Sequence, residues 1–344
     1  MSDENTGTGE GLPGLDLDRL RSYLDREVPG LVSGPLTGHV ITGGKSNLTY
    51  VVTDGTGSWV VRRPPLGHVL ATAHDMAREY RVMTALRDTD VPVPRTHHLC
   101  EDTEVLGAPF YVMEHVGGTA FRTQEEIGPL GADGIHAVAE RLVTTLGRLH
   151  AVDPATVGLA DFGRPDGYLE RQVRRWSKQL EASRSRDIPG IDELRDRLAR
   201  TIPEPSAPAI VHGDYRLDNV LVTDDGELTA VLDWEMATLG DPLVDLGLML
   251  VYRERPVTGG DHPATSAEGF PSSAELVEMY AAATGRDVSR LGWYVAFGCF
   301  KLAVIAEGIH FRHGQGLTVG AGFDGIGDVV APLVERAHTM LKED

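Results

Sequence analysis

Three polar residues in the middle of the chain have the types and spacing that phosphoryl-transfer chemistry requires. Asp214 is followed five positions later by Asn219, and Asp233 comes fourteen residues after Asn219. A hydroxyl that attacks the terminal phosphoryl group of a nucleoside triphosphate needs a carboxylate to orient it and accept its proton, and Asp214 is predicted to be that base. Because Mg²⁺ prefers hard oxygen ligands, Asn219 and Asp233 are the predicted metal ligands.

Short apolar segments around these residues indicate how they are positioned. Val211 precedes His212-Gly213-Asp214, and the apolar runs 220–222 and 231–232 follow. This pattern places Asp214 in a loop between strands and brings Asp233 in after a hairpin. Taken alone, such residues between strands are also ordinary turn chemistry. The ordered set of strand, acid, amide, strand and second acid favours the functional interpretation.

The motifs His-Gly-Asp at 212–214 and Asp-Trp-Glu at 233–235 resemble those of the aminoglycoside phosphotransferase and choline kinase-like family. The segments 43–50 and 60–65 are similar to one branch in particular, the kinase domains fused to some acyl-CoA dehydrogenases. The resemblance extends from about residue 40 to about residue 248. It implies an α+β, bilobal, protein-kinase-like fold, with a small β-rich lobe followed by a larger, mostly helical lobe.

The resemblance also implies an activity and some supporting residues. The expected reaction moves the γ-phosphoryl group of ATP, or of GTP, with Mg²⁺, to a hydroxyl of a small molecule such as an amino alcohol, a sugar or a hydroxyacyl-CoA. Asp245 resembles the acid that hydrogen-bonds the catalytic loop, and His212 is expected to pack beneath that loop. Asp241 comes only eight positions after Asp233, which leaves no room for the activation segment of a protein kinase. The alternative is a catalytically silent nucleotide- or ligand-binding module.

A glycine-rich turn is the first candidate for contact with the nucleotide. Gly43, Gly44, Ser46 and Asn47 are predicted to lie over the phosphates on a strand–turn–strand unit. A Walker A loop would need a glycine where His39 stands, so that interpretation fails. A plain hairpin turn remains the alternative.

A phosphate-binding cation is expected on the strand that follows this turn. Protein kinases use a lysine there, and Arg62 takes its place by resemblance, with Glu79 in the next helix as its ion-pair partner. Arg63 takes this role if the strand register differs by one residue; otherwise its side chain points to the opposite face, against solvent or a Glu-rich surface. For Glu79 the alternative is an exposed position on a solvated helix.

The segment that ends the first lobe resembles the hinge of kinases, where main-chain groups bind adenine. Glu114 and Val116 are therefore candidate nucleotide contacts through their backbones. A buried strand end explains the same residues equally well.

The predicted organisation is a disordered tail over 1–15, a nucleotide-binding lobe over 16–116 and a catalytic, acceptor-binding lobe over 117–344. Leucines at helical spacing predict a helix that begins at Asp16, and strands are expected between 39 and 63 around an Asp-Gly-Thr-Gly turn. A helix over 68–87 and a strand over 110–116 complete the first lobe. Helices of the second lobe are predicted near 132–150, 167–182, 191–201, 243–252, 273–283, 289–308 and 329–341.

Composition limits the class of partner and the compartment. Among 344 residues 32 are basic and 51 acidic, and the formal net charge of −19 argues against nucleic acid or an anionic membrane as partner. The two distant cysteines imply no disulfide framework, which suits a reducing cytoplasm, and the acidic start of the chain is unlike a signal peptide. The apolar stretch 291–305 is interrupted by Lys301 and too short to span a bilayer, so a buried helix is expected. His310 and His313 lack the companions that a zinc site needs.

Overall fold

The chain forms two compact units. The computed structural model describes residues 12–41, 47–66, 75–254, 262–316 and 325–343. Unit 1 contains the residues up to Gly117 together with the later segment Thr229–Glu235, and unit 2 contains Gly118–Leu228 and the residues from Met236 onward.

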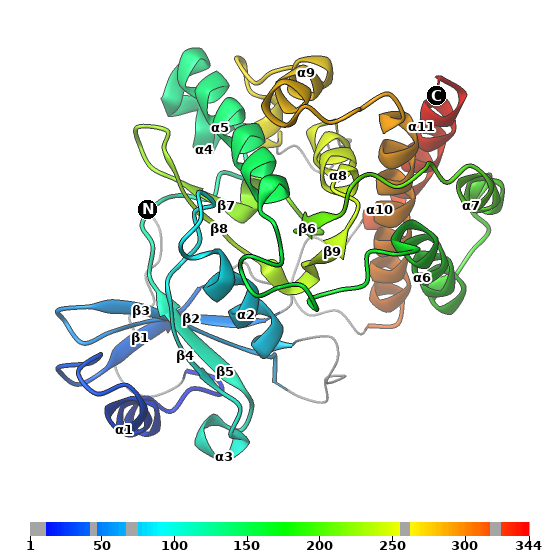
Figure 1. Cartoon of the computed structure of the whole chain (residues 1–344). Coiled ribbons are helices and arrows are strands. Elements are labelled where there is room, and N and C mark those ends of the chain that lie inside the picture. Colours follow the sequence, from blue (N-terminus) through cyan, green and yellow to red (C-terminus); the bar gives the residue numbers. More distant parts are fainter. Residues whose placement is uncertain (1–11, 42–46, 67–74, 255–261, 317–324, 344) are drawn as a thin grey trace. The chain divides into compact units, whose positions relative to one another are not determined.

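Unit 1 is built on a five-stranded antiparallel sheet (Figure 1). In sheet order its strands are β1 (Thr37–Val40), β2 (Leu48–Thr53), β3 (Ser58–Arg63), β5 (Phe110–Glu114) and β4 (Thr96–Cys100). The predicted turn between β2 and β3 is present: Asp54 Oδ1 accepts hydrogen bonds from the backbone N–H groups of Thr56 and Gly57 at 2.8 and 2.7 Å. Gly55 adopts φ +86°, a conformation that glycine adopts without steric cost.

The described residues of unit 1 form three α-helices: α1 (Leu17–Glu27), α2 (Met76–Leu86) and α3 (Thr103–Leu106). Asp16 caps α1 as predicted, because its carboxylate accepts from the backbone N–H of Arg19 at 3.0 Å. The leucine face of α1 packs on one face of the sheet, in a core that includes Tyr50, Val61 and Phe110. The predicted helix over 68–87 is seen from Met76, and residues 68–74 lie outside the described residues.

Residues 12–15 pack onto unit 1, so the tail predicted over 1–15 is wrong for this part. Leu15 is buried, the Tyr50 hydroxyl donates to the carbonyl of Pro13, and the Arg63 guanidinium donates to the carbonyl of Gly14. These long-range bonds leave no trace in the local sequence pattern. Residues 1–11 lie outside the described residues.

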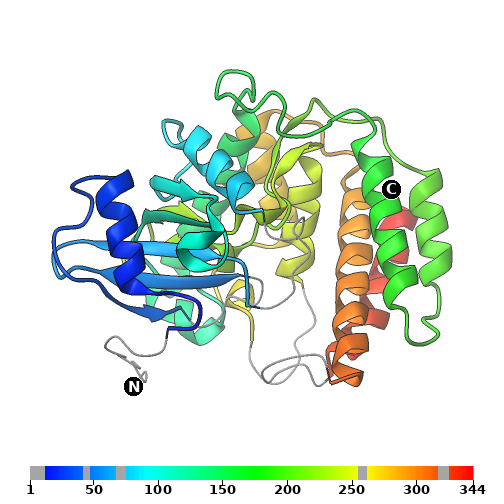
Figure 2. The same cartoon turned by 90° about the horizontal axis from the view of Figure 1, so that it is seen from below.

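Unit 2 is mostly helical, as predicted. Its helices are α4 (Gln124–Ile127), α5 (Gly131–Ala151), α6 (Tyr168–Ser183), α7 (Ile191–Arg200), α8 (Leu243–Arg253), α9 (Ser273–Thr284), α10 (Leu291–Gly314) and α11 (Val330–Glu343). The seven predicted helices are all present, and among the α-helices in the described residues of unit 2 only the short α4 was missed. Helix α10 packs against α6, α7, α8 and α11 (Figure 2).

Helix α10 extends beyond the apolar stretch from which it was predicted. It has 24 residues, so by length and composition it could cross a membrane, which corrects the expectation that the stretch is too short. However, 72% of its apolar window is buried against the rest of unit 2. Burial on several sides is typical of the core helix of a globular protein.

Short strands flank the polar motifs. In unit 2, β6 (Ala209–Val211) pairs antiparallel with β9 (Thr238–Gly240), and β7 is Val220–Val222. Strand β8 (Leu228–Val231) leads into the segment that belongs to unit 1. The predicted division at 116–117 did not foresee this return of the chain. It occurs because Val231 N–H donates to the carbonyl of Pro92 at 2.8 Å and the Thr229 hydroxyl donates to that of Gly117 at 2.8 Å.

Candidate active site

In unit 1, Arg62 lies between two carboxylates. Its Nη2 atom lies 2.5 Å from Asp233 Oδ1, and its Nε atom lies 3.3 Å from Glu79 Oε2. The side chains of Arg62 and Glu79 are 13% and 1% exposed, so Glu79 is not on a solvated helix face. The structure therefore brings together a cation and an acid that the sequence analysis predicted as a pair, and adds Asp233 to them.

Further hydrogen bonds hold Glu79 in place. The Tyr111 hydroxyl donates to Glu79 Oε2 at 2.9 Å, and Asn47 Nδ2 donates to Glu79 Oε1 at 3.2 Å and to Glu235 Oε2 at 3.3 Å. Burial alone would lower the pKa of Arg62, but the negative charges of Glu79 and Asp233 outweigh it and raise that pKa. Arg62 therefore stays protonated, and the cluster is a charge-assisted network anchored on β3 and α2.

Asp233 has an unusual backbone conformation. Its φ of +65° makes it the one non-glycine residue with a left-handed backbone among the residues that the structure describes. Asp tolerates this region better than most residues, but such conformations are typical of sites where the surroundings dictate the geometry. The bend directs the carboxylate to Arg62, while the neighbouring Trp234 is fully buried and donates from its indole to the carbonyl of Val231 at 3.0 Å.

Arg63 is not exposed to solvent, which corrects the expectation from strand alternation. It is 4% exposed and donates to backbone carbonyl groups, among them that of Leu106 at 2.8 Å. Trp59 and Val61, which share its face of β3, lie in the core beneath α1. The prediction that Arg63 lies on the face of β3 opposite to Arg62 is correct. Because α1 and residues 12–15 cover that face, Arg63 is a structural residue of the core.

The remaining nucleotide candidates are only partly placed. Gly43, Gly44 and Ser46 lie outside the described residues. Glu114 ends β5 with an exposed side chain, and its backbone N–H already donates to the carbonyl of Arg95 at 2.8 Å. Val116 is half-buried. Any adenine contact of Glu114 would therefore involve its carbonyl group. The nucleotide-binding roles of Gly43, Gly44, Ser46, Glu114 and Val116 stay predictions.

In unit 2, hydrogen-bond donors surround the carboxylate of Asp214. The Tyr252 hydroxyl donates to Asp214 Oδ1 at 2.9 Å, and Asn219 Nδ2 donates to Oδ2 at 3.0 Å and to the backbone carbonyl of Asp214 at 2.8 Å. Arg216 Nε lies 3.7 Å from Oδ2, while its Nη2 makes a shorter pair with Asp218 at 2.7 Å. Burial and the charge of Asp214 raise the pKa of Tyr252, so this residue stays a donor.

The backbone before Asp214 is tied to a buried acid, as the resemblance implied. Asp245 accepts from the backbone N–H groups of His212 and Gly213, both at 2.7 Å. His212 is fully buried, and its Nδ1 accepts from the backbone N–H of Asp214 at 3.2 Å. Both predicted supports therefore lie directly beneath the loop.

A neutral histidine completes the support of Asp245. His150 Nδ1 lies 2.7 Å from the Tyr280 hydroxyl, and His150 Nε2 lies 3.2 Å from Asp245 Oδ2. Burial lowers the pKa of His150. Burial would raise the pKa of Asp245, but the hydrogen bonds from His150 and the loop amides outweigh it and hold that pKa below its ordinary value. The consistent assignment is that Tyr280 donates to His150, which donates to Asp245.

Gly213 lies in close contact with Met236 and with Lys301. It adopts φ +86°, and a Cβ atom at this position would lie 2.8 Å from both Cβ and the carbonyl oxygen of Met236. The ammonium group of the buried Lys301 donates to the Gly213 carbonyl at 2.6 Å. The loop that carries Asp214 is therefore held from both sides of its backbone.

Sequence reasoning missed three residues around Asp214, namely Tyr252, Arg216 and Lys301. It also missed three supporting residues, Tyr111, His150 and Tyr280. Lys301 had a usable signal, because a single cation within the apolar stretch 291–305 needs a polar partner once that helix is buried. Tyr252 had none, since its role arises only where the end of α8 meets the loop. Asp241 accepts from the backbone N–H of Leu243 at 3.0 Å, near the start of α8, whose cap position is occupied by Pro242.

Residues 37–294 match the sequence profile of the phosphotransferase enzyme family. The chain belongs to this family. Acyl-CoA dehydrogenase family member 11 of Gallus gallus is 33% identical over 343 residues, which cover 95% of this chain but 44% of that protein. The chain thus spans less than half of the length of this relative.

Solved structures of the family share the fold. A protein of Ralstonia eutropha named as a candidate aminoglycoside phosphotransferase is 35% identical, with a TM-score of 0.82 and coverage of 95% of this chain and 98% of that one. A thermostable mutant of aminoglycoside phosphotransferase APH(4)-Ia, in a ternary complex with ADP and hygromycin B, is 17% identical with a TM-score of 0.58 over 93% of this chain and 97% of that one. The family resemblance and the α+β kinase-like fold predicted from the motifs are confirmed.

Proposed function

We propose that the chain is a Mg²⁺-dependent kinase that transfers the γ-phosphoryl group of ATP, or of GTP, to a hydroxyl of a small molecule. The observation that supports this best is the carboxylate of Asp214, oriented by Asn219 and Tyr252 on a loop whose backbone is tied to Asp245. These contacts fix the orientation of the Asp214 carboxylate, which can accept a proton. Because each carboxylate oxygen has two lone pairs, each can still accept one more hydrogen bond.

In the proposed reaction Asp214 receives the proton of the acceptor hydroxyl. As the hydroxyl oxygen forms its bond to the γ-phosphorus, the bond from that phosphorus to the bridging oxygen breaks, and the nucleoside diphosphate leaves with the electron pair. The proton passes to the carboxylate of Asp214. Tyr252 and Asn219 keep that carboxylate in one orientation throughout.

The donor atoms of two residues fit Mg²⁺. Asn219 uses its amide nitrogen on Asp214, so its amide oxygen is the atom that can meet a metal ion. Asp233 offers a carboxylate that is 29% exposed. Both are the hard oxygen ligands that Mg²⁺ prefers, and the bound ion would supply neutralisation of charge on the β- and γ-phosphates.

Arg62 is the proposed partner of the nucleotide phosphates, with Glu79 as the acid that keeps it in place. If Asp233 held a metal ion, Arg62 would keep Glu79 as its carboxylate partner, and its guanidinium fork would be available for phosphate oxygens. Exchange of partners therefore couples the binding of metal ion and nucleotide. A silent module, the rival proposal, would keep the Arg62–Asp233 pair permanently.

The acceptor and the compartment also belong to this proposal. The family resemblance suggests three acceptor classes: aminoglycoside-like amino alcohols, sugars, and hydroxylated acyl-CoA compounds. The first agrees with a structural neighbour solved with hygromycin B, and the last with a relative named as an acyl-CoA dehydrogenase family member. The compartment proposed is the cytoplasm, where ATP is available and where the buried thiols of Cys100 and Cys299 stay reduced.

The test is a screen for ADP formation with hydroxylated acceptors of these three classes, run beside calorimetric titration of ATP with and without Mg²⁺. We expect Mg²⁺ to tighten ATP binding and at least one acceptor to be phosphorylated. Asp214→Asn is the control, since it should keep ATP binding and lose transfer. Tight ATP binding without any Mg²⁺ effect, and with no transfer to any acceptor, would instead favour the silent module.

A further inference from the structure

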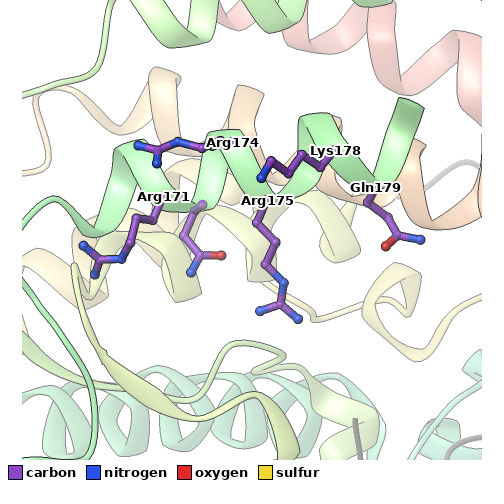
Figure 3. A pocket seen from close by; sticks show the side chains of 6 residues that line it. Arg171, Arg174, Arg175, Lys178 and Gln179 are labelled. Atoms are coloured by element: carbon purple, nitrogen blue, oxygen red, sulfur yellow. The ribbon is translucent and has the colours of Figure 1, made fainter. Parts of the chain in front are cut away.

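Helix α6 carries a hollow lined by cations. Its lining consists of Arg171, Gln172, Arg174, Arg175, Lys178 and Gln179, and its volume is about 550 Å³. Figure 3 shows the four cationic side chains extending from this one helix. Arg174, Arg175 and Lys178 are exposed, so their charged groups are accessible to a ligand.

The charge of this surface contrasts with that of the chain. The formal net charge is −19, yet the lining contains four cations and no carboxylate. Within the described part of the chain, no acid forms a salt bridge with any of the four. Arg171 and Arg175, like Arg174 and Lys178, stand four positions apart, and like charges at that spacing destabilise a helix by about 0.2–0.5 kcal/mol per pair. An anionic ligand would relieve this repulsion.

Two contacts connect this basic surface to the catalytic loop. The Arg175 guanidinium lies 5.5 Å from the ring centroid of Trp176, and the Lys301 ammonium lies 5.5 Å from the same centroid. Lys301 in turn donates to the carbonyl of Gly213, the residue before Asp214. Burial lowers the pKa of Lys301, and Arg175 adds to this effect while Asp214 opposes it, which indicates that both charges act on Lys301.

We propose that the hollow on α6 binds a phosphate or carboxylate group of the acceptor, so that the molecule phosphorylated by this chain is a hydroxylated anion. This inference rests on the proposed function in taking Asp214 as the base. Guanidinium groups suit the ligand, because their planar fork matches the oxygens of phosphate and carboxylate. A polycationic amino alcohol would meet four like charges there, which makes it the least suitable of the three acceptor classes.

Binding can be measured without catalysis. The full chain is titrated calorimetrically with inorganic pyrophosphate and with citrate, in the absence of Mg²⁺, so that the two arms distinguish a phosphate site from a carboxylate site. We expect Arg174→Gln/Lys178→Gln to bind the preferred anion about tenfold more weakly than the parent chain. Both side chains are exposed, so folding should be unaffected, and circular dichroism checks this.

Two control variants separate this site from other cations. Arg200→Gln removes an exposed arginine from α7 and should bind the anion like the parent. Arg62→Ala removes the cation proposed for the nucleotide and should also keep the binding measured here. The inference is overturned if the double variant binds as tightly as the parent, or if Arg62→Ala alone abolishes binding.

A kinetic measurement ties the site to the acceptor. For the acceptor found in the screen, we expect the double variant to raise the KM about tenfold while the KM for ATP stays unchanged. An acceptor that is neutral or cationic, or whose KM does not change, would contradict the inference. If the anion binds as expected but no transfer occurs with any acceptor, the proposed function fails while the anion site stands.

Discussion

The two acids of the candidate active site are held in different ways. Asp233 in unit 1 is paired with a cation, Arg62, at 2.5 Å, on a left-handed backbone. Asp214 in unit 2 accepts its hydrogen bonds from neutral donors, Tyr252 and Asn219, at 2.9 and 3.0 Å, while the nearest cation, Arg216, lies 3.7 Å away and pairs more closely with Asp218 at 2.7 Å. Their side chains are 29% and 23% exposed, so burial does not explain the difference.

The difference matches the chemistry proposed for each acid. Before it binds a metal ion, a carboxylate can be neutralised by a nearby cation, which leaves it when the metal ion binds. A carboxylate that will accept a proton must keep its charge and its orientation, and neutral donors provide the orientation without cancelling the charge. The partners of an acid therefore indicate its role where its exposure does not.

The strongest test of this comparison is Asp214→Asn, which keeps the shape of the side chain and removes the base. We expect turnover to fall by about two orders of magnitude or more, while the dissociation constant of ATP stays nearly unchanged. Steady-state kinetics and calorimetry measure the two effects separately. Asp218→Asn is the matched control, because Asp218 pairs with Arg216, and its effect should be small. A variant that keeps most of its activity would remove Asp214 from the mechanism.

Asp233→Ala tests the other acid. We expect Mg²⁺-dependent ATP binding to weaken about 10- to 100-fold, because a charged metal ligand is lost. Without Mg²⁺, ATP should bind at least as well as to the parent, since Arg62 no longer has Asp233 as a competitor for phosphate. Calorimetry in the presence and absence of Mg²⁺ shows both effects. Equal losses under the two conditions would point to damage of the fold.

Replacing the two neighbouring arginines of β3, Arg62 and Arg63, should have different kinds of effect. Arg62→Ala should weaken ATP about tenfold and leave adenosine unchanged, since only ATP presents anionic oxygens. Arg63→Ala should leave ATP affinity alone but lower the free energy of unfolding by about 2 kcal/mol, because buried carbonyl groups lose a charged donor. Denaturant titration measures this loss. A phosphate-selective defect in the Arg63 variant would contradict the assignment of Arg62.

Tyr252→Phe removes one neutral donor from Asp214. We expect kcat to fall by up to about tenfold and the ATP affinity to stay unchanged. This range corresponds to the loss of one hydrogen bond whose net free-energy contribution is about 1 kcal/mol. A fall as large as that of Asp214→Asn would mean that Tyr252 itself takes part in proton transfer. Comparing the kcat values of the two variants decides between these interpretations.

The smallest effect concerns pH and the support beneath Asp214. The folded pKa of His150 lies below its ordinary value of 6.5, so between the two values the unfolded chain binds a proton that the folded chain does not. This contribution to stability is therefore lost as pH falls below about 6.5, by at most about 1.4 kcal/mol per pH unit. Asp245, whose pKa is lowered from 3.8, keeps its contribution until more acidic pH.

His150→Gln isolates this effect. Thermal unfolding at pH 7.5, 6.0 and 5.0 should show a variant that is less stable than the parent at pH 7.5 but loses less stability on acidification. The other histidines are common to both proteins, so their contributions cancel in the difference. An identical slope for the two proteins would show that His150 is not the titrating group.

Sequence predicted those elements whose signals are local. Asp16 before regularly spaced leucines predicted α1, and the turn at Asp54 and Gly55 predicted the hairpin. Strand β4 was missed because its polar residues Thr96, His97 and His98 show no apolar alternation. The return of residues 229–235 to unit 1 depends on hydrogen bonds to distant backbone groups, which no local pattern records.

The same limit applies to the site. Asp214, Asn219 and Asp233 could be selected because their types and spacing carry the chemistry, and Asp245 and His212 by resemblance. Tyr252 could not, because a tyrosine at the end of a helix has no sequence mark until the fold brings it to Asp214. Arg63 shows the converse. Strand alternation predicted the correct face of β3 for this residue, but it could not show that α1 and residues 12–15 cover that face and bury Arg63.

The backbone at Gly213 also limits how this loop can evolve. Protein kinases carry arginine between the histidine and aspartate of the corresponding motif, whereas here the left-handed φ and the nearby Met236 leave no space for any side chain. A route from one motif to the other must therefore relocate the Met236 segment before, or together with, the change at position 213. Randomising position 213 alone should return glycine, so the two loop types are separated by a step that single substitutions do not cross.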